Sequence, residues 1–279
     1  MFLGYNCIMN KIIICIFILV TSCSSLEQRS KLAFTIANQA GFSSVLYQQS
    51  GYSIQSFEKR SSSNNSFISI YIEGDGRSWI DRNTISSNPT PTMPLALELA
   101  ALDQSLNVIY LARPCQYVTD QKCSSKVWTS HQFSEQVLQS YMDVLDKIKK
   151  QAPTSQFDLV GYSGGATITL LLGANRSDIR SIRTIAGNLN HTQLSEVTKT
   201  TPLTGSIPAK TFILKTKHIP QTHYYTEQDQ VITALIYKRY KNLFKDNNCI
   251  KIERVEGTDH YSGWQSFWKY HHIKIPSCS

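Results

Sequence analysis

The clearest pattern along the chain is an apolar run that ends in a glycine-rich turn and is followed at once by a second apolar run. The segment 157–172 reads Phe-Asp-Leu-Val-Gly-Tyr-Ser-Gly-Gly-Ala-Thr-Ile-Thr-Leu-Leu-Leu. The first run has the length of a buried strand, and the second has the small and aliphatic residues of a buried helix. The spacing therefore predicts a strand, a sharp turn at 161–165 and a helix.

Strand-like and helix-like patterns alternate through the second half of the chain. Such alternation is typical of a parallel sheet covered by helices, so we expect an α/β fold. Runs rich in β-branched and aromatic residues predict strands at 43–48, 52–57, 67–72, 107–112, 181–186, 220–226 and 250–255. Apolar residues at helical spacing predict helices at 31–40, 94–103, 133–150 and 231–244.

The first 22 residues have the pattern of an export signal. Lys11 precedes the apolar run 12–20, which is too short to span a bilayer. The run leads into Leu-Val-Thr-Ser-Cys at 19–23, which resembles the lipobox of bacterial lipoproteins. That resemblance implies cleavage before Cys23, a diacylglycerol on its thiol and, with Ser24 following, attachment to the outer membrane of the bacterial cell envelope on its periplasmic face. A plain signal peptide, which would leave a soluble secreted or periplasmic protein, is the alternative.

Cysteine usage agrees with export. Beyond the signal and Cys23, an even number of cysteines is left: Cys115, Cys123, Cys249 and Cys278. An even number favours disulfides in an oxidising compartment. Of the pairings available, Cys115 with Cys123 would close one loop, and Cys249 with Cys278 would tie the last strand to the C-terminus. A zinc site is the competing explanation, but no Cys-x-x-Cys or histidine pair flanks these positions, so no metal is expected.

Composition and charge limit the kinds of binding partner that we expect. The chain is 41% hydrophobic and 17% charged, as in ordinary globular proteins. Removal of residues 1–22 takes away one charged side chain, Lys11, so 28 basic residues become 27 against 20 acidic ones, a net charge of +7. No basic run or basic patch interleaved with aromatic residues is present, so nucleic acid is not an expected partner. The sequence carries no signal for an oligomeric state.

The candidate chemistry centres on the turn at 161–165, where Gly-x-Ser-x-Gly stands between a predicted strand and a predicted helix. This is the pattern of a nucleophile elbow, which raises a serine hydroxyl above the sheet at a helix N-terminus. Ser163 would be that serine; an unreactive serine in a glycine-rich turn is the alternative. Downstream, His260 follows the last predicted strand, and Asp229 and Glu227 follow the strand before it.

In this order the residues resemble those of the α/β-hydrolase superfamily, over about residues 67–268. The resemblance implies a mostly parallel central sheet with helices on both faces, and a triad of Ser163, Asp229 and His260. Thr226 stands where the family usually has glycine, so the acid turn departs from the pattern and Glu227 is the alternative acid.

The resemblance also implies two backbone donors for a tetrahedral oxyanion. One is the N–H of Gly164, and the other is that of Asp75 in the sequence Glu-Gly-Asp-Gly at 73–76, with Gly76 as a substitute. An acidic side chain at position 75 would have to turn away from the site. Aromatic candidates for the pocket wall, with plain packing as the alternative, are Trp79, Tyr117, Trp128 and Trp264.

The function implied by the resemblance is that of a serine hydrolase. It would cleave an ester or related acyl bond in a small-molecule or lipid-like substrate through an acyl-enzyme, without a cofactor. A peptidase or thioesterase of the same fold and a non-catalytic lipoprotein that uses the fold as a binding scaffold stay open. We divide the chain into a signal peptide (1–22), a tether with early strands (23–66) and a catalytic core (67–279), in which 188–219 would form a small cap.

Overall fold

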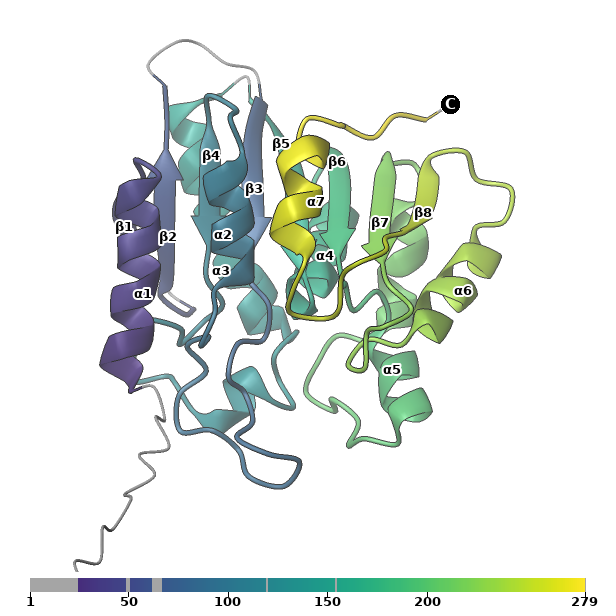
Figure 1. Cartoon of the computed structure of the whole chain (residues 1–279), viewed down its shortest axis with the longest axis horizontal. Helices are drawn as coiled ribbons and strands as arrows, with labels where there is room; N and C mark the ends of the chain where they lie inside the picture. Colours follow the sequence, from purple (N-terminus) through teal and green to yellow (C-terminus); the bar gives the residue numbers. More distant parts are fainter. Residues whose placement is uncertain (1–24, 49–50, 62–66, 119, 154, 279) are drawn as a thin grey trace, which may run out of the picture.

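The computed structural model describes residues 25–48, 51–61, 67–118, 120–153 and 155–278. In these residues eight strands form one sheet in the order β1-β2-β4-β3-β5-β6-β7-β8 (Figure 1). Strand β2 runs antiparallel to both its neighbours, and every other neighbouring pair is parallel. The strands are β1 (Ser43–Tyr47), β2 (Ile54–Lys59), β3 (Phe67–Ile72), β4 (Val108–Leu111), β5 (Gln156–Tyr162), β6 (Ile179–Ile185), β7 (Gln221–Tyr225) and β8 (Ile250–Arg254). The prediction of an α/β fold with a mostly parallel sheet is confirmed.

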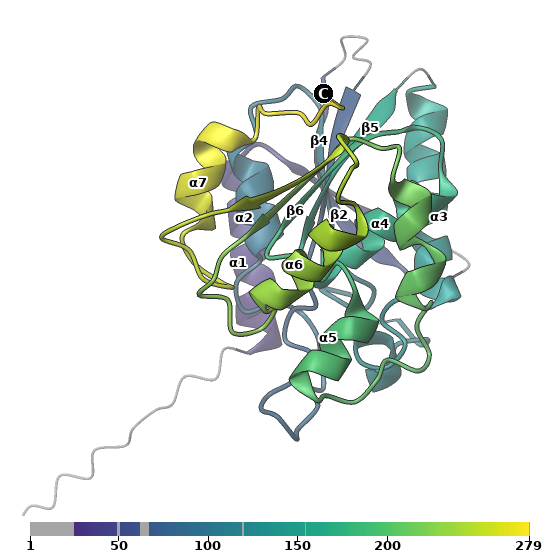
Figure 2. The same cartoon turned by 90° about the vertical axis from the view of Figure 1, so that its right-hand side faces the viewer.

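Helices cover both faces of the sheet (Figures 1 and 2). One face carries α1 (Leu26–Gln39), α2 (Leu95–Leu102) and α7 (Trp264–His271), and the other carries α3 (Glu135–Gln151), α4 (Gly164–Asn175) and α6 (Ala234–Leu243). Alternation along each strand supplies the two cores, because successive side chains point to opposite faces. On β3, for example, Ile70 and Ile72 pack toward α3 and α4, whereas Tyr71 packs toward α7.

Two helices begin three or more residues from their predicted starts, and hydrogen bonds explain both differences. Helix α1 begins at Leu26 rather than residue 31, because Ser25 and Gln28 form a capping box that the sequence interpretation overlooked. Helix α6 begins at Ala234 rather than residue 231, because a carboxylate oxygen of Asp229 accepts the N–H groups of residues 231 and 232 and holds them in a loop.

The early strands and the segment 188–219 are both parts of the same sheet-based body. Strands β1 and β2, which the sequence division placed before the catalytic core, extend the sheet through pairing of β2 with β4. The segment 188–219 contains α5 (His191–Thr198), η2 (Ala209–Thr211) and η3 (Ile213–Thr216), and it buries Phe212 and Ile213 in the core beside α4. Its service as a cap stays a prediction.

Both predicted disulfides are present. Cys115 bonds to Cys123, with their Cα atoms 5.8 Å apart, and Cys249 bonds to Cys278. The first bond closes a short loop after β4, a constraint worth about 2–3 kcal/mol when calculated from chain entropy. The predicted signal and Cys23 lie outside the described residues. Within the described residues, no helix combines the length and the apolar character that crossing a membrane requires.

Candidate active site

Ser163 lies at the turn from β5 to α4 in a backbone conformation that residues with side chains rarely adopt. Its φ is 49° and its ψ is −120°, a strained region that persists only where the surroundings enforce it. Close packing supplies the enforcement, since a Cβ atom on Gly165 would lie 2.3 Å from the carbonyl oxygen of Ile72. The turn places Ser163 at the N-terminus of α4, where the first backbone N–H groups have no partner within the helix.

The structure brings the other two predicted triad residues to this serine. The loop after β8 carries His260, whose Nε2 lies 3.1 Å from Ser163 Oγ. On the other side of the ring, His260 Nδ1 lies 2.8 Å from Asp229 Oδ2, and the remaining oxygen of Asp229 accepts the N–H groups of Val231 and Ile232, both at 2.8 Å. Asp229 is thus held by the backbone so that one oxygen faces the imidazole.

The alternative acid lies elsewhere, and a histidine on β7 has a structural place. Glu227 is exposed and pairs with Lys238 at 3.4 Å. His223 is fully buried between Thr184 and Gln221, and burial lowers its pKa from 6.5 to about 3, so it is a neutral structural histidine. Thr226, which departs from the family pattern, donates its hydroxyl to the carbonyl of Thr258 and so links the acid turn to the loop that carries His260.

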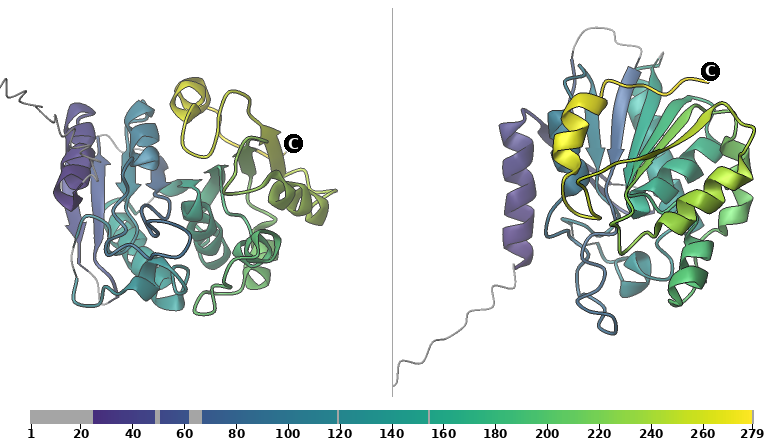
Figure 3. Two further views of the ribbon diagram at one scale, coloured as in Figure 1. Left: turned by 60° about the horizontal axis from the view of Figure 1, so that its bottom comes forward. Right: turned by 45° about the vertical axis from the view of Figure 1, so that its right-hand side comes forward.

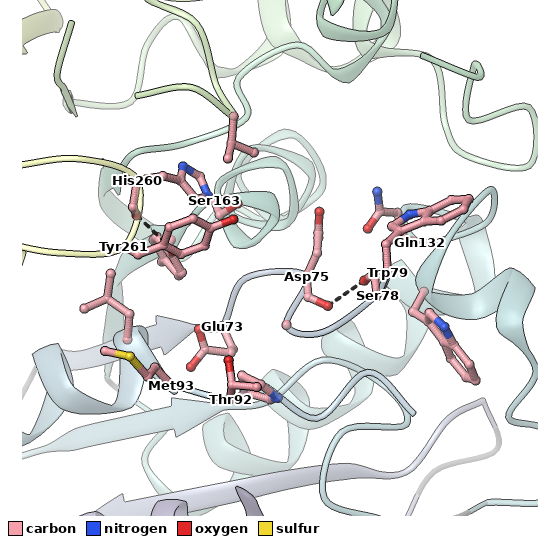
Figure 4. A pocket seen from close by; sticks show the side chains of 16 residues that line it. Glu73, Asp75, Ser78, Trp79, Thr92, Met93, Gln132, Ser163, His260 and Tyr261 are labelled. Carbon is pink, nitrogen blue, oxygen red and sulfur yellow. Dashed lines mark hydrogen bonds between the residues drawn. The ribbon is translucent and has the colours of Figure 1, made fainter. Parts of the chain in front are cut away.

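The carboxylate of Asp75 does not turn away from the site. It packs directly on the nucleophile turn, because a Cβ atom on Gly164 would lie 1.8 Å from Asp75 Oδ1. In Figure 4 this side chain lies between Ser163 and Gln132. Arg113 Nη1 pairs with the same oxygen at 2.8 Å, and the Gln132 amide, oriented with its nitrogen toward the carboxylate, donates to it at 2.8 Å. A negative charge that would oppose an oxyanion is therefore paired with a buried cation.

The loop after β4 holds the segment 73–76 at a second point. Gln116 Nε2 donates to the carbonyl of Gly74 at 3.0 Å, while Gln116 Oε1 accepts the N–H of Arg113 at 2.9 Å. The residues on either side of Gln116 have positive φ, 69° at Cys115 and 63° at Tyr117. The disulfide at Cys115 helps to hold this strained loop, which in turn positions the candidate oxyanion donor.

For the ester hydrolysis that the sequence predicts, replacement of Arg113 by methionine is expected to lower kcat by about 100-fold, the usual scale for loss of oxyanion stabilisation. The physical reason is that the Asp75 carboxylate would then lie unpaired beside Gly164. Steady-state kinetics of Arg113→Met, Asp75→Asn and the double variant measure this. Because the double variant removes both charges, it should recover part of the rate. A double variant no faster than Arg113→Met would contradict the explanation.

A cleft of about 510 Å³ opens at Ser163 and His260, and its volume is within the usual range for small-molecule sites. Its wall combines aromatic, apolar and acidic side chains (Figure 4). Besides Ser163 and His260, the residues that line it include Glu73, Asp75, Trp79, Met93, Trp128, Gln132, Tyr162, Val231 and Tyr261. Trp79 and Trp128 were predicted as candidates for this wall, whereas Tyr117 and Trp264 do not line it. No residue of 188–219 lines it.

Glu73 is a buried carboxyl that lines the cleft and was not among the residues predicted for the site. The residue is 1% exposed, and burial raises its pKa from 4.5 to about 7. The carboxyl also accepts hydrogen bonds from the N–H groups of Gly74 and Ala96 and from the hydroxyl of Tyr110, and these lower the pKa by less than burial raises it. A carboxyl that prefers to be protonated in the folded state destabilises that state when it ionises.

Glu73→Gln is therefore expected to stabilise the protein above neutral pH and to be nearly neutral at pH 4. In the wild type, the protonated carboxyl contributes fully to the free energy of unfolding below pH 4.5, and this contribution is lost as the pH rises through about 7. The difference in unfolding free energy between variant and wild type should grow by about 3 kcal/mol from pH 4 to pH 8. Urea unfolding at the two pH values measures it, with the exposed Glu227→Gln as control. An unchanged difference would show that Glu73 ionises normally.

Comparison with known proteins identifies the fold. No family model and no curated protein sequence matches this chain. Among solved structures, it is similar to Est1E from Butyrivibrio proteoclasticus with ferulic acid bound (TM-score 0.59, 13% identity, 83% of this chain and 98% of that chain). It is also similar to the esterase Pf2001 from Pyrococcus furiosus (TM-score 0.59, 11% identity, 84% and 92%) and to an alpha-beta serine hydrolase homologue from Coxiella burnetii (TM-score 0.53, 12% identity, 78% and 89%).

These similarities extend over most of both chains, but the sequence identities are low. They show the fold, which is that of the α/β hydrolases.

Proposed function

We propose that this α/β-hydrolase-fold chain is a serine hydrolase that cleaves an ester or related acyl bond through an acyl-enzyme. The observation that carries the proposal is one continuous hydrogen-bonded chain from Ser163 Oγ to His260 at 3.1 Å and from His260 to Asp229 at 2.8 Å, beside a cleft. Its members follow one another in the sequence as Ser, Asp and His, the order usual in this fold.

Attack begins at Ser163. Neutral His260 accepts the serine proton at Nε2 while Oγ bonds to the acyl carbon, and its Nδ1–H donates to Asp229, which fixes the tautomer and stabilises the imidazolium. The imidazolium then gives the proton to the leaving alcohol as the bond to the acyl carbon breaks. Water then attacks the acyl carbon and gives a proton to the same imidazole. As the bond from the acyl carbon to Ser163 Oγ breaks, the imidazolium returns that proton to Oγ and the carboxylic acid leaves.

Stabilisation of the oxyanion is assigned to the backbone N–H groups of Gly164 and Asp75. Gly164 is the first residue of α4, so its N–H points out of the helix N-terminus. The segment that contains Asp75 is held against the nucleophile turn, where a Cβ atom on Gly74 would lie 3.2 Å from the Cβ atom of Ser163. The pairing of Asp75 with Arg113 keeps its side-chain charge from opposing the oxyanion.

A small acyl group suits the cleft. Aromatic side chains at its wall can bury an apolar acyl or aryl group by contact with their faces. The structural neighbour Est1E holds ferulic acid, an aromatic acid. We therefore propose esters of small acyl and aryl acids as the first substrates to test.

The test of the proposed function is labelling with a fluorophosphonate, which modifies serines only when they are activated. We expect labelling at a single site, and mass spectrometry of the tryptic peptides should place the adduct on Ser163. A folded protein, as judged by circular dichroism, that stays unlabelled would favour the non-catalytic scaffold. Parallel assays with an amide and a thioester of the same acyl group separate esterase from peptidase and thioesterase.

We also propose that the chain is exported and lipid-anchored at Cys23 in the cell envelope. The support is the lipobox-like sequence at 19–23 together with four further cysteines that pair in two disulfides.

Metabolic labelling with palmitate is expected to mark the wild-type protein and not Cys23→Ser, because the thiol is the proposed attachment site. Fractionation of the same cells should place the wild type with the membranes. Equal recovery of both variants as free periplasmic protein would leave a plain signal peptide as the account of residues 1–22.

A further inference from the structure

Exposed apolar side chains gather around the mouth of the cleft. Trp79, Met93, Val231 and Tyr261 line the cleft and are also exposed to solvent. Ile80 and Ile85 are exposed beside them on a short hairpin, in which Trp79 and Ile85 form a β-bridge. We call these six residues the mouth patch. Apolar side chains that gather around one opening mark an interaction site more often than isolated exposed residues do.

The mouth patch lies at the same end of the molecule as the start of α1. The parallel strands end at the lower side of Figure 1, where the blue segment between β3 and α2 projects and where α1 begins. The views in Figures 2 and 3 agree on this arrangement. The segment that follows α7 lies at the opposite end.

Chain length ties this end to the proposed anchor. Cys23 precedes Leu26, the exposed first residue of α1, by three residues. Three extended residues span at most about 10 Å, so a lipid on Cys23 would hold the start of α1 close to the headgroups. A bilayer in that position would face the projecting hairpin and the cleft mouth.

We propose that the mouth patch inserts into the headgroup region of a lipid bilayer, so that the cleft opens toward the membrane and takes acyl esters that partition into it. The chemistry of the patch fits this partner, because tryptophan, tyrosine and aliphatic side chains favour the membrane interface. Arg77 precedes the hairpin and Arg82 lies within it, and the chain without residues 1–22 has a net charge of +7, which attracts anionic headgroups. The identity of the substrate rests on the proposed hydrolase function, and the position of the bilayer rests on the proposed anchor at Cys23.

Tryptophan fluorescence can test the contact directly. Of the four tryptophans only Trp79 is exposed, at 46%, against 9% for Trp128 and 0% for Trp264 and Trp268. The full chain is mixed with vesicles of phosphatidylglycerol and phosphatidylcholine that carry bromine on the acyl chains, which quenches indoles at short range. We expect quenching of up to about a quarter of the emission, one indole in four, and none in Trp79→Phe. Co-flotation of the protein with vesicles would not test the patch, because a lipid-anchored protein floats with vesicles whether or not the patch contacts them.

A matched pair of variants distinguishes membrane binding by the mouth patch from nonspecific hydrophobic adsorption. Ile80→Ser with Ile85→Ser removes two apolar side chains of the hairpin that do not line the cleft, and Ile273→Ser with Ile275→Ser removes two exposed isoleucines after α7. The hairpin variant should lose the quenching and hydrolyse a vesicle-borne ester roughly tenfold more slowly, with hydrolysis of a soluble ester unchanged. The C-terminal variant should behave as wild type.

Three results would overturn the proposal. The first is absence of quenching in the wild type, and the second is equal quenching in the two double variants. The third is a wild-type dimer that the hairpin substitutions, but not the C-terminal ones, convert to a monomer; that result would assign the patch to contact with a second copy of the chain. Fluorophosphonate labelling of the same samples reports separately on Ser163. A labelled protein without quenching therefore refutes the membrane contact alone, and quenching without labelling refutes the hydrolase alone.

Discussion

Ser163→Ala is expected to abolish ester hydrolysis, with a loss in kcat on the order of 10⁵- to 10⁶-fold, while the protein stays folded. The substitution removes only the hydroxyl oxygen, which is the proposed nucleophile, and leaves the tight turn occupied by a residue of similar size. Steady-state kinetics with a chromogenic ester measure the loss, and circular dichroism with a thermal melt checks the fold.

The matched variant is His260→Ala, which should be almost as damaging because the serine and its base act as a unit. For the same reason, the double variant should be no slower than either single variant beyond experimental error. Residual hydrolysis in Ser163→Ala that stays near the wild-type rate would mean that another group attacks the ester.

The second large effect is expected for Asp229→Asn, a loss in kcat of about 10⁴-fold. Asparagine keeps an oxygen for the N–H groups of Val231 and Ile232, so the acid turn should survive. Its amide, however, carries no negative charge to accept a hydrogen bond from the Nδ1–H of His260. Neither the productive tautomer of His260 nor the imidazolium is then stabilised.

Glu227→Gln is the control for Asp229→Asn. Glu227 lies two residues away on the same turn, is exposed and forms an ion pair with the exposed Lys238, so the loss of its charge should change kcat by less than about twofold. Stopped-flow or steady-state kinetics on the same ester rank the two variants. A larger loss for Glu227→Gln than for Asp229→Asn would remove Asp229 from the proposed triad.

The central strand and the turn at Ser163 were accessible from the sequence because their signals are local. The alternation of apolar runs and glycines at 157–172 fixes strand, turn and helix within one short segment. The bounds predicted for β3, 67–72, agree with the structure for a similar reason, since an unbroken β-rich run ends abruptly in Glu-Gly-Asp-Gly.

Chain order then located the two other residues of the hydrogen-bonded chain. The candidates His260 and Asp229 each follow a late strand, and strands that run parallel deliver such loops to one edge of the sheet. The sequence left Glu227 as an alternative because both carboxylates follow the same strand. The choice depends on which of them the backbone turns inward, and the structure turns in Asp229.

Side-chain partners that are distant in the sequence were not predicted. The direction of the Asp75 side chain depends on Arg113 and Gln132, which lie in other loops, and no local sequence pattern predicts these contacts. Glu73 is similar, since its burial arises where β3, β4 and α2 converge. The antiparallel direction of β2 also went unpredicted, because its short, partly polar sequence fits either direction.

The contact between Asp75 and Gly164 restricts the order in which mutations can accumulate. A side chain at 164 would collide with the carboxylate, so alanine there should be harmful while position 75 is Asp, yet tolerable once that residue is glycine. Replacing Asp75 in turn leaves Arg113 buried without its anionic partner. We therefore expect epistasis among the three positions, in which the effect of one substitution depends on the residue at another. A combinatorial library at 75, 113 and 164 should yield active variants mainly as matched sets, with few single-step paths between them.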